Sequence, residues 1–159
     1  MIQRIQTLYL TLVVILGTLL CFFPAVNFYS PEGAEQFRQF TTTFAHIVDV
    51  TNPESPLNVI NIVSLSILSV TIPVIALVTI FLYKKRILQA RINIITVVLC
   101  AGWYAVLAVY VWFAKENLQV EWYLTPWAAI PLVNLILTLM ATRAILKDEA
   151  LVRAADRLR

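Results

Sequence analysis

The sequence predicts an all-α membrane protein, a bundle of four transmembrane helices, and three observations lead to this prediction. Hydrophobic residues make up 60 % of the 159 residues and charged residues only 13 %, whereas about 25 % of a typical soluble domain is charged. The apolar residues gather in four long runs, and the Lys and Arg residues gather in the segments between particular runs. The runs, none of which contains Asp, Glu, Lys, Arg or His, are 5–23, 57–83, 92–113 and 122–142.

Each run is long enough to cross a bilayer as one helix. The runs hold 19, 27, 22 and 21 residues, and a hydrocarbon core of about 30 Å takes about 20 helical residues. A helix satisfies its own backbone hydrogen bonds in lipid, whereas barrel strands would be shorter and would alternate in polarity. We therefore expect one membrane domain, 1–159, with an outer loop at 24–56 and a helical tail at 143–159.

The basic residues predict that both termini lie in the cytoplasm. Ten of the 12 Lys and Arg residues precede the first run, lie between the second and third runs, or follow the fourth. Short cytoplasmic loops are enriched in these residues. A cleaved signal peptide is the alternative for the first run, but the run is long and no small-residue cleavage site follows it, which favours a retained span. The chain is thus expected to be a multi-pass protein.

The outer loop, 24–56, is the largest segment expected outside the membrane on the far side from the termini. Ser30-Pro31-Glu32-Gly33 is a turn signal. The stretch 36–50 fits both a helical face and the alternation of a strand. We favour a small β-hairpin, between the first two helices, that packs on their outer ends.

Two prolines and one short link shape the expected helices. Pro73 in the second run and Pro131 in the fourth remove a backbone hydrogen bond and should kink their helices. The link between the second and third runs is short and basic, so these runs should form a tight helical hairpin.

The polar residues inside the runs are all neutral, and two interpretations compete. They either line a polar crevice or, as is more usual, join helices by hydrogen bonds of about 0.6–2 kcal/mol each. We favour hydrogen bonds between helices. Separately, the basic link between the second and third runs should lie near lipid head groups. The candidate interhelical residues are Asn58, Asn61, Ser64, Asn93 and Asn134.

A strip of small residues runs along the third run. Ala101, Ala105 and Ala108 recur at helical spacing beside Gly102. Small side chains let two helix backbones approach closely, so this strip permits close helix contact.

The sequence assigns no catalytic, cofactor-binding or metal site. His46 is the single histidine, so zinc and haem sites lack ligands. Cys21 and Cys100 form no Cys-x-x-Cys pair, which argues against a thiol oxidoreductase. The charge-free runs argue against ion-coupled transport. Because the basic residues lie beside spans, we expect membrane lipids and a protein partner, and no nucleic acid.

Charged residues at the cytoplasmic end are the candidate contacts with a partner protein or with lipid. Glu149 and Arg153 are spaced to support a helix, and Leu151, Ala155 and Leu158 form an apolar stripe on the same tail. The tail either extends the fourth helix into solvent or binds the inner leaflet or a partner. The candidate contacts are Arg4, Lys84, Lys85, Arg86, Lys147, Asp148, Glu149, Arg153, Asp156 and Arg157.

Both ends of the chain carry distinctive sequences, MIQRIQTLYL at the N-terminus and KDEALVRAADRLR at the C-terminus. They resemble the termini of a Bacteroidota inner-membrane family called domain of unknown function 4293, and the resemblance extends over the whole chain. It implies four spans in the inner membrane of a Gram-negative bacterium. It implies no activity, cofactor or catalytic residue.

Three functional hypotheses follow. The first is a non-enzymatic accessory or assembly subunit that binds another membrane protein complex. The alternative is a small membrane protein that binds or handles lipids, with contacts from the Asn-rich second run and the basic link. An integral membrane enzyme is third, because the sequence shows no nucleophile–base pair.

Overall fold

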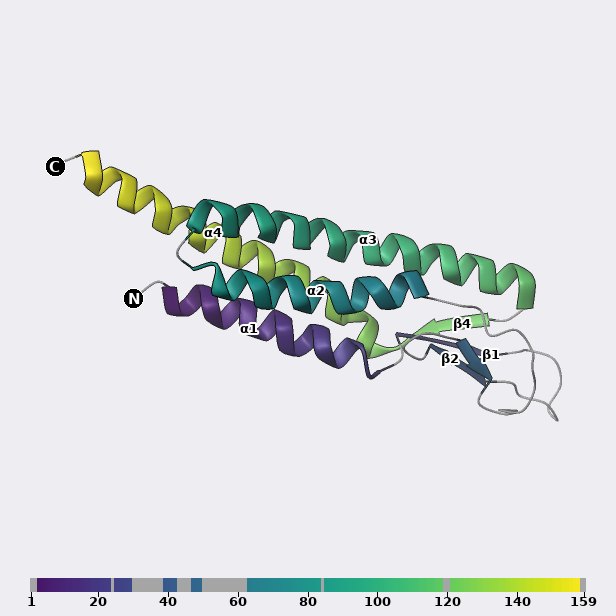
Figure 1. The fold of residues 1–159 in the computed structure, drawn as a ribbon. Helices are drawn as coiled ribbons and strands as arrows, with labels where there is room; N and C mark the ends of the chain where they lie inside the picture. Colours follow the sequence, from purple (N-terminus) through teal and green to yellow (C-terminus); the bar gives the residue numbers. More distant parts are fainter. Residues whose placement is uncertain are drawn as a thin grey trace.

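Four α-helices lie side by side, and a small sheet lies at one end of the bundle (Figure 1). The computed structural model describes residues 3–23, 25–29, 39–42, 47–49, 63–83, 85–118 and 121–157. Each helix contacts two others, since α1 and α3 both pack against α2 and α4. The predicted helical bundle is therefore confirmed, and its helices form a ring in chain order. The helices are α1 (Gln3–Leu20), α2 (Val63–Phe81), α3 (Arg86–Leu118) and α4 (Ile130–Arg157).

Among the described residues, three helices are long and apolar enough to cross a membrane. They lie at Val63–Phe81, Arg86–Glu116 and Pro126–Val152, and the shorter apolar stretch Ile5–Leu20 lies in α1. The 18 residues of α1 rise about 27 Å, slightly less than a hydrocarbon core of about 30 Å. The prediction of a membrane protein with several apolar helices is thus confirmed.

The start of the fourth run differs from the prediction, because its first three residues, expected to be helical, belong to strand β4 (Glu121–Leu124). A 3-10 helix, η1 (Pro126–Ala129), follows, and α4 begins only at Ile130. Pro126 restricts the residue before it to extended backbone, and Thr125 has φ −81° and ψ 161°. The proline therefore separates the strand from the helix.

The predicted kink at Pro131 is wrong. Pro131 is the second residue of α4, where its missing N–H would have no partner within the helix. Pro73 does lie inside α2, and there it faces α1. A Cβ atom added to Gly17 would lie 3.1 Å from the Cβ of Pro73, so the absence of a side chain at Gly17 allows the two helices to approach closely.

The sheet is larger than the expected hairpin. Three strands come from the loop between α1 and α2, and β4 joins them from the connection between α3 and α4, in the antiparallel order β3-β2-β1-β4. Phe28 of β1 pairs with Phe40 on one side and with Trp122 on the other. The turn expected at residues 30–33 and His46 lie outside the described residues. The strands from the loop are β1 (Val26–Tyr29), β2 (Gln39–Thr42) and β3 (Ile47–Asp49).

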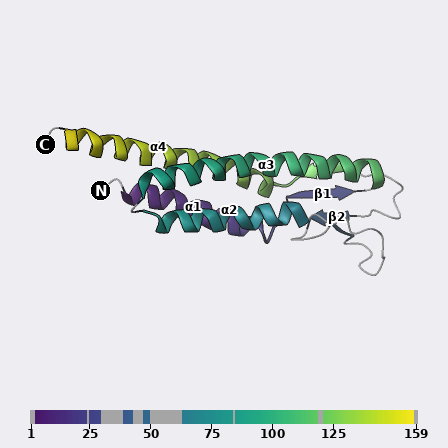
Figure 2. The same cartoon turned by 45° about the horizontal axis from the view of Figure 1, so that its top comes forward.

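Both termini lie at the end of the bundle opposite the sheet, and α4 projects beyond the other helices there (Figures 1 and 2). We call this end, which holds Gln3, Lys85 and Arg157, the terminal end, and the other the sheet end. The core between them is closed by apolar side chains from all four helices. Its deeply buried members include Leu10, Val13, Ile72, Ala76, Trp103, Leu107 and Ile145.

Candidate functional site

At the terminal end, α3 begins inside the predicted basic link, so Arg86 and Arg91 belong to the helix. The N–H of Gln89 donates to the carbonyl of Lys85 at 2.9 Å, so Lys85 caps the helix and Arg86 is its first residue. The first turn contains no acidic residue, although acidic side chains are favoured at that position. The start of α3 therefore combines N–H donors that have no acceptor within the helix with cationic side chains.

One ion pair joins the first residue of α3 to the last third of α4. The Nη1 of Arg86 lies 3.2 Å from the Oδ2 of Asp148, and the two side chains are only 25 % and 15 % exposed. The two residues are 62 positions apart in the sequence. The fold thus brings together two groups of predicted contact residues, those of the link and those of the tail.

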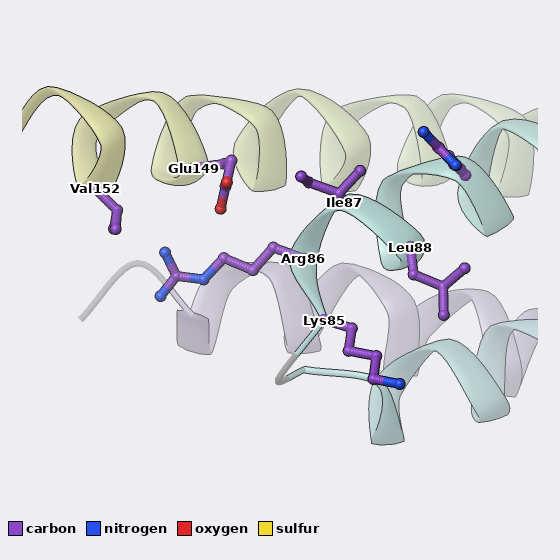
Figure 3. A pocket seen from close by; sticks show the side chains of 7 residues that line it. Lys85, Arg86, Ile87, Leu88, Glu149 and Val152 are labelled. Carbon is purple, nitrogen blue, oxygen red and sulfur yellow. The ribbon is translucent and has the colours of Figure 1, made fainter. Parts of the chain in front are cut away.

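Beside this ion pair lies an open hollow of about 650 Å³, which we call the basic hollow. Figure 3 shows Glu149 and Val152 entering it from α4, while side chains of the link and of the first turn of α3 border it from the other side. Its lining combines three cationic side chains, one carboxylate and three aliphatic side chains. The lining residues are Lys85, Arg86, Ile87, Leu88, Arg91, Glu149 and Val152.

The remaining predicted contact residues are less closely grouped. Lys147 is exposed on α4. Arg4 lies at the start of α1, and Arg153, Asp156 and Arg157 lie in the last turns of α4, so helix position alone places them at the terminal end. Lys84 lies outside the described residues.

The middle of the bundle contains a neutral polar cluster around Ser69. Its hydroxyl accepts a hydrogen bond from Nε1 of Trp103 at 2.9 Å and donates to the carbonyl of Leu65 at 2.9 Å. Pro73 has no N–H, so the carbonyl of Ser69 lacks its usual helical donor. The Sγ of Cys21 donates weakly to that carbonyl at 3.7 Å. The sequence analysis did not single out Trp103, because Pro73 marks only the carbonyl of Ser69 and Trp103 bonds the hydroxyl.

The predicted interhelical polar residues differ in whether they form a hydrogen bond to another helix. The hydroxyls of Ser64 and Tyr110 lie 2.7 Å apart across α2 and α3. Nε2 of Gln89 donates to the carbonyl of Thr79 at 3.2 Å, a link between the same helices that the sequence analysis did not single out. Asn58 and Asn61 lie outside the described residues.

Asn93 and Asn134 are both buried, and each has at least one polar side-chain atom without a hydrogen-bond partner among the described residues. Asn93 is 0 % and Asn134 1 % exposed, and both side-chain polar atoms of Asn93 and Oδ1 of Asn134 have no hydrogen-bond partner among the described residues. The prediction that Asn93 joins two helices by a hydrogen bond is therefore wrong. The nearby Thr138 and Thr142 donate to carbonyls of their own helix, at 2.7 and 2.8 Å, and do not donate to the amides.

The comparison with protein families adds one finding to this geometry. A family model described as Domain of unknown function (DUF4293) matches residues 2–158. The chain belongs to this family. No curated protein matches the chain. The resemblance at the two termini therefore extends over nearly the whole sequence, and the family description assigns no chemistry to any residue of this DUF4293 member.

The small-residue strip of this DUF4293 member faces outward. Ala101, Ala105 and Ala108 are exposed on α3, and a Cβ atom added to Gly102 would meet nothing within 4 Å. The strip therefore takes no part in close packing among the described residues of the bundle. On the opposite side of α3, Trp103 is buried in the core.

Among the described residues, no three His, Cys, Asp or Glu side chains are grouped so that they could hold a metal ion. Cys21 and Cys100 are free thiols. Cys21 lies just after α1, and Cys100 lies in α3. The candidate functional site is therefore at the terminal end, where it consists of the ion pair of Arg86 with Asp148 and the basic hollow.

Proposed function

We propose that the protein is a non-enzymatic accessory or assembly subunit of a larger complex in a bacterial inner membrane. In this proposal all four helices span the bilayer, and both termini lie in the cytoplasm. The terminal end carries the contacts with a partner membrane protein.

The packing of α1 supports its role as the fourth span. It lies alongside α2 and α4, and the contact of Gly17 with Pro73 places the two helices close together. Its outward residues Ile5, Leu8 and Ile15 are 50–58 % exposed, as the lipid-facing residues of a span would be. An α1 outside the membrane would expose this apolar face to water, which is unfavourable.

The single observation that carries the proposal is the projection of α4. This helix continues without a break from Ile130 to Arg157, past the ends of its neighbours (Figure 1). Leu151 and Val152 are 52 % and 40 % exposed on it, among charged residues. A rigid arm with both apolar and charged side chains can dock on another protein, since apolar contacts supply affinity and charges supply specificity.

The alternative of lipid handling inside the bundle gains no support from the interior. Asn93 and Asn134 are the side-chain amides buried there, and at 0 % and 1 % exposure they line no open space among the described residues that could hold a lipid. This observation concerns only lipid inside the bundle and does not bear on lipid bound at its outer surface.

Purification from inner membranes in mild detergent, followed by mass spectrometry, tests the proposal. We expect the full chain to purify with one partner in constant ratio, and a chain that ends at Ala150 to lose it. The truncated chain keeps the ion pair of Arg86 with Asp148, so the bundle should stay folded. Lys115→Gln, an exposed position near the sheet end, is the matched control and should keep the partner. A full chain that purifies alone, or a truncated chain that keeps the same partner, would contradict the proposal.

A further inference from the structure

The basic hollow at the start of α3 has the composition of a phosphate site next to an apolar surface. Lys85, Arg86 and Arg91 supply three positive charges to its lining, and Glu149 supplies one negative charge. Asp148 pairs with Arg86, so one positive charge remains in excess. We propose that the hollow binds the phosphate of an anionic phospholipid head group. The proposal is independent of the partner protein.

The geometry of the lining suits a phosphodiester. Guanidinium groups bind phosphate oxygens through two parallel hydrogen bonds, whereas Lys supplies a point charge. Arg91 and Lys85 are both exposed and can turn toward a ligand, while Arg86 is held by Asp148. The first N–H groups of α3 add donors that no helical carbonyl accepts. One net positive charge matches the single charge of a phosphodiester.

The apolar part of the lining favours a lipid over free phosphate. Ile87, Leu88 and Val152 are 45 %, 41 % and 40 % exposed, and they border the same hollow as the cations (Figure 3). A free phosphate ion gains nothing from these side chains. The glycerol and upper acyl carbons of a phospholipid would cover them and remove apolar area from water.

The position of the hollow along the chain fits the depth of a lipid head group. Arg91, in the second turn of α3, is the last charged residue before the uncharged run, which begins at Ile92. In a spanning helix this boundary lies where hydrocarbon meets head groups. The phosphate would therefore reach the cations while its acyl chains lie along α3.

The structure offers a matched pair of arginines to test this. Arg86 pairs with Asp148, and α3 and α4 run in opposite directions, so five residues further into the bundle α3 reaches Arg91 and α4 reaches Arg143. Both arginines are exposed and lie at the same height. Only Arg91 lines the hollow.

The experiment counts retained lipids by native mass spectrometry, with the full chain in micelles that contain equal amounts of phosphatidylglycerol and phosphatidylcholine. We expect the unmodified protein to retain one phosphatidylglycerol in preference to phosphatidylcholine. Arg91→Gln and Lys85→Gln should each reduce this retention about five-fold, the effect of one basic residue near an anionic lipid surface. Arg143→Gln should leave it unchanged, and a parallel thermal melt should show all three variants folded.

Three results would overturn the proposal. No preference for phosphatidylglycerol in the unmodified protein would show that the hollow does not select anionic lipid. An equal loss in Arg91→Gln and Arg143→Gln would indicate a general attraction of anionic lipid to any basic residue. Displacement of the lipid by an excess of inorganic phosphate would show that the site is one for soluble anions.

Discussion

Two polar regions of the bundle, the cluster around Ser69 in the middle and the basic hollow at the terminal end, differ in charge and in exposure. In the middle the groups are neutral, and Trp103 is 1 % and Ser69 7 % exposed. At the terminal end the groups are charged, and Lys85 and Arg91 are exposed. A buried polar group must keep its partner or lose stability, whereas an exposed charge is free to exchange partners. The middle therefore holds the fold together, and the terminal end is the region suited to binding.

The largest expected effect is at Trp103. Trp103→Ala would leave a cavity in the core and remove the hydrogen bond to Ser69, and should lower the free energy of unfolding by about 3–5 kcal/mol. Trp112 lies on the same helix but is 65 % exposed, so Trp112→Ala should change stability by less than about 1 kcal/mol. Denaturant titration in micelles, followed by circular dichroism, measures both. Equal losses in the two variants would contradict the assignment of the core.

A smaller effect is expected where α1 meets α2. Gly17→Ala would place a methyl group 3.1 Å from the ring of Pro73, and should cost about 1–3 kcal/mol through overpacking. Gly102→Ala is its matched control, because nothing lies within 4 Å of the added atom and alanine favours a helix by up to about 1 kcal/mol. The same titrations compare them. A Gly17 variant as stable as the Gly102 variant would show that α1 does not pack tightly on α2.

The sequence predicted those features that depend on neighbouring residues. The apolar runs predicted the helices, and the alternation in 36–50 correctly favoured strands over a helix for Gln39–Thr42 and Ile47–Asp49. Trp122 was assigned to a helix because its pairing partner, Phe28, is distant in the chain. Pro126 could have indicated that the helix begins after it, but it lies within an apolar run that was read as one continuous helix.

The candidate site was predictable in composition and not in geometry. The basic link and the charged tail were both recognised, yet the pair of Arg86 with Asp148 depends on how far α3 and α4 slide along each other. Likewise, Asn93 was expected to bond across helices, and the rotation of α3 instead buries it away from any partner among the described residues. Helix rotation and sliding are set by packing of the whole bundle, which no local pattern records.

The smallest expected effect concerns the ion pair at the terminal end. A double-mutant cycle with Arg86→Gln and Asp148→Asn should give a coupling energy of at most about 1 kcal/mol, because both side chains retain contact with solvent. The coupling should fall further as salt is added. The cycle is measured by the same unfolding titrations. A coupling above about 3 kcal/mol would show that the terminal end is as structural as the middle and would remove the distinction between the two regions.

The central claim is that four helices span the membrane and leave the charged terminal end in the cytoplasm. Single cysteines at Gln3, Lys115 and Lys147, placed in a chain with Cys21→Ser and Cys100→Ala, can be labelled with a thiol reagent that does not cross the inner membrane. The account predicts that the cysteine at Lys115 reacts from the periplasmic side, and that those at Gln3 and Lys147 react only after the membrane is opened. Labelling of Gln3 and Lys147 from opposite sides, or protection of Lys115, would contradict it.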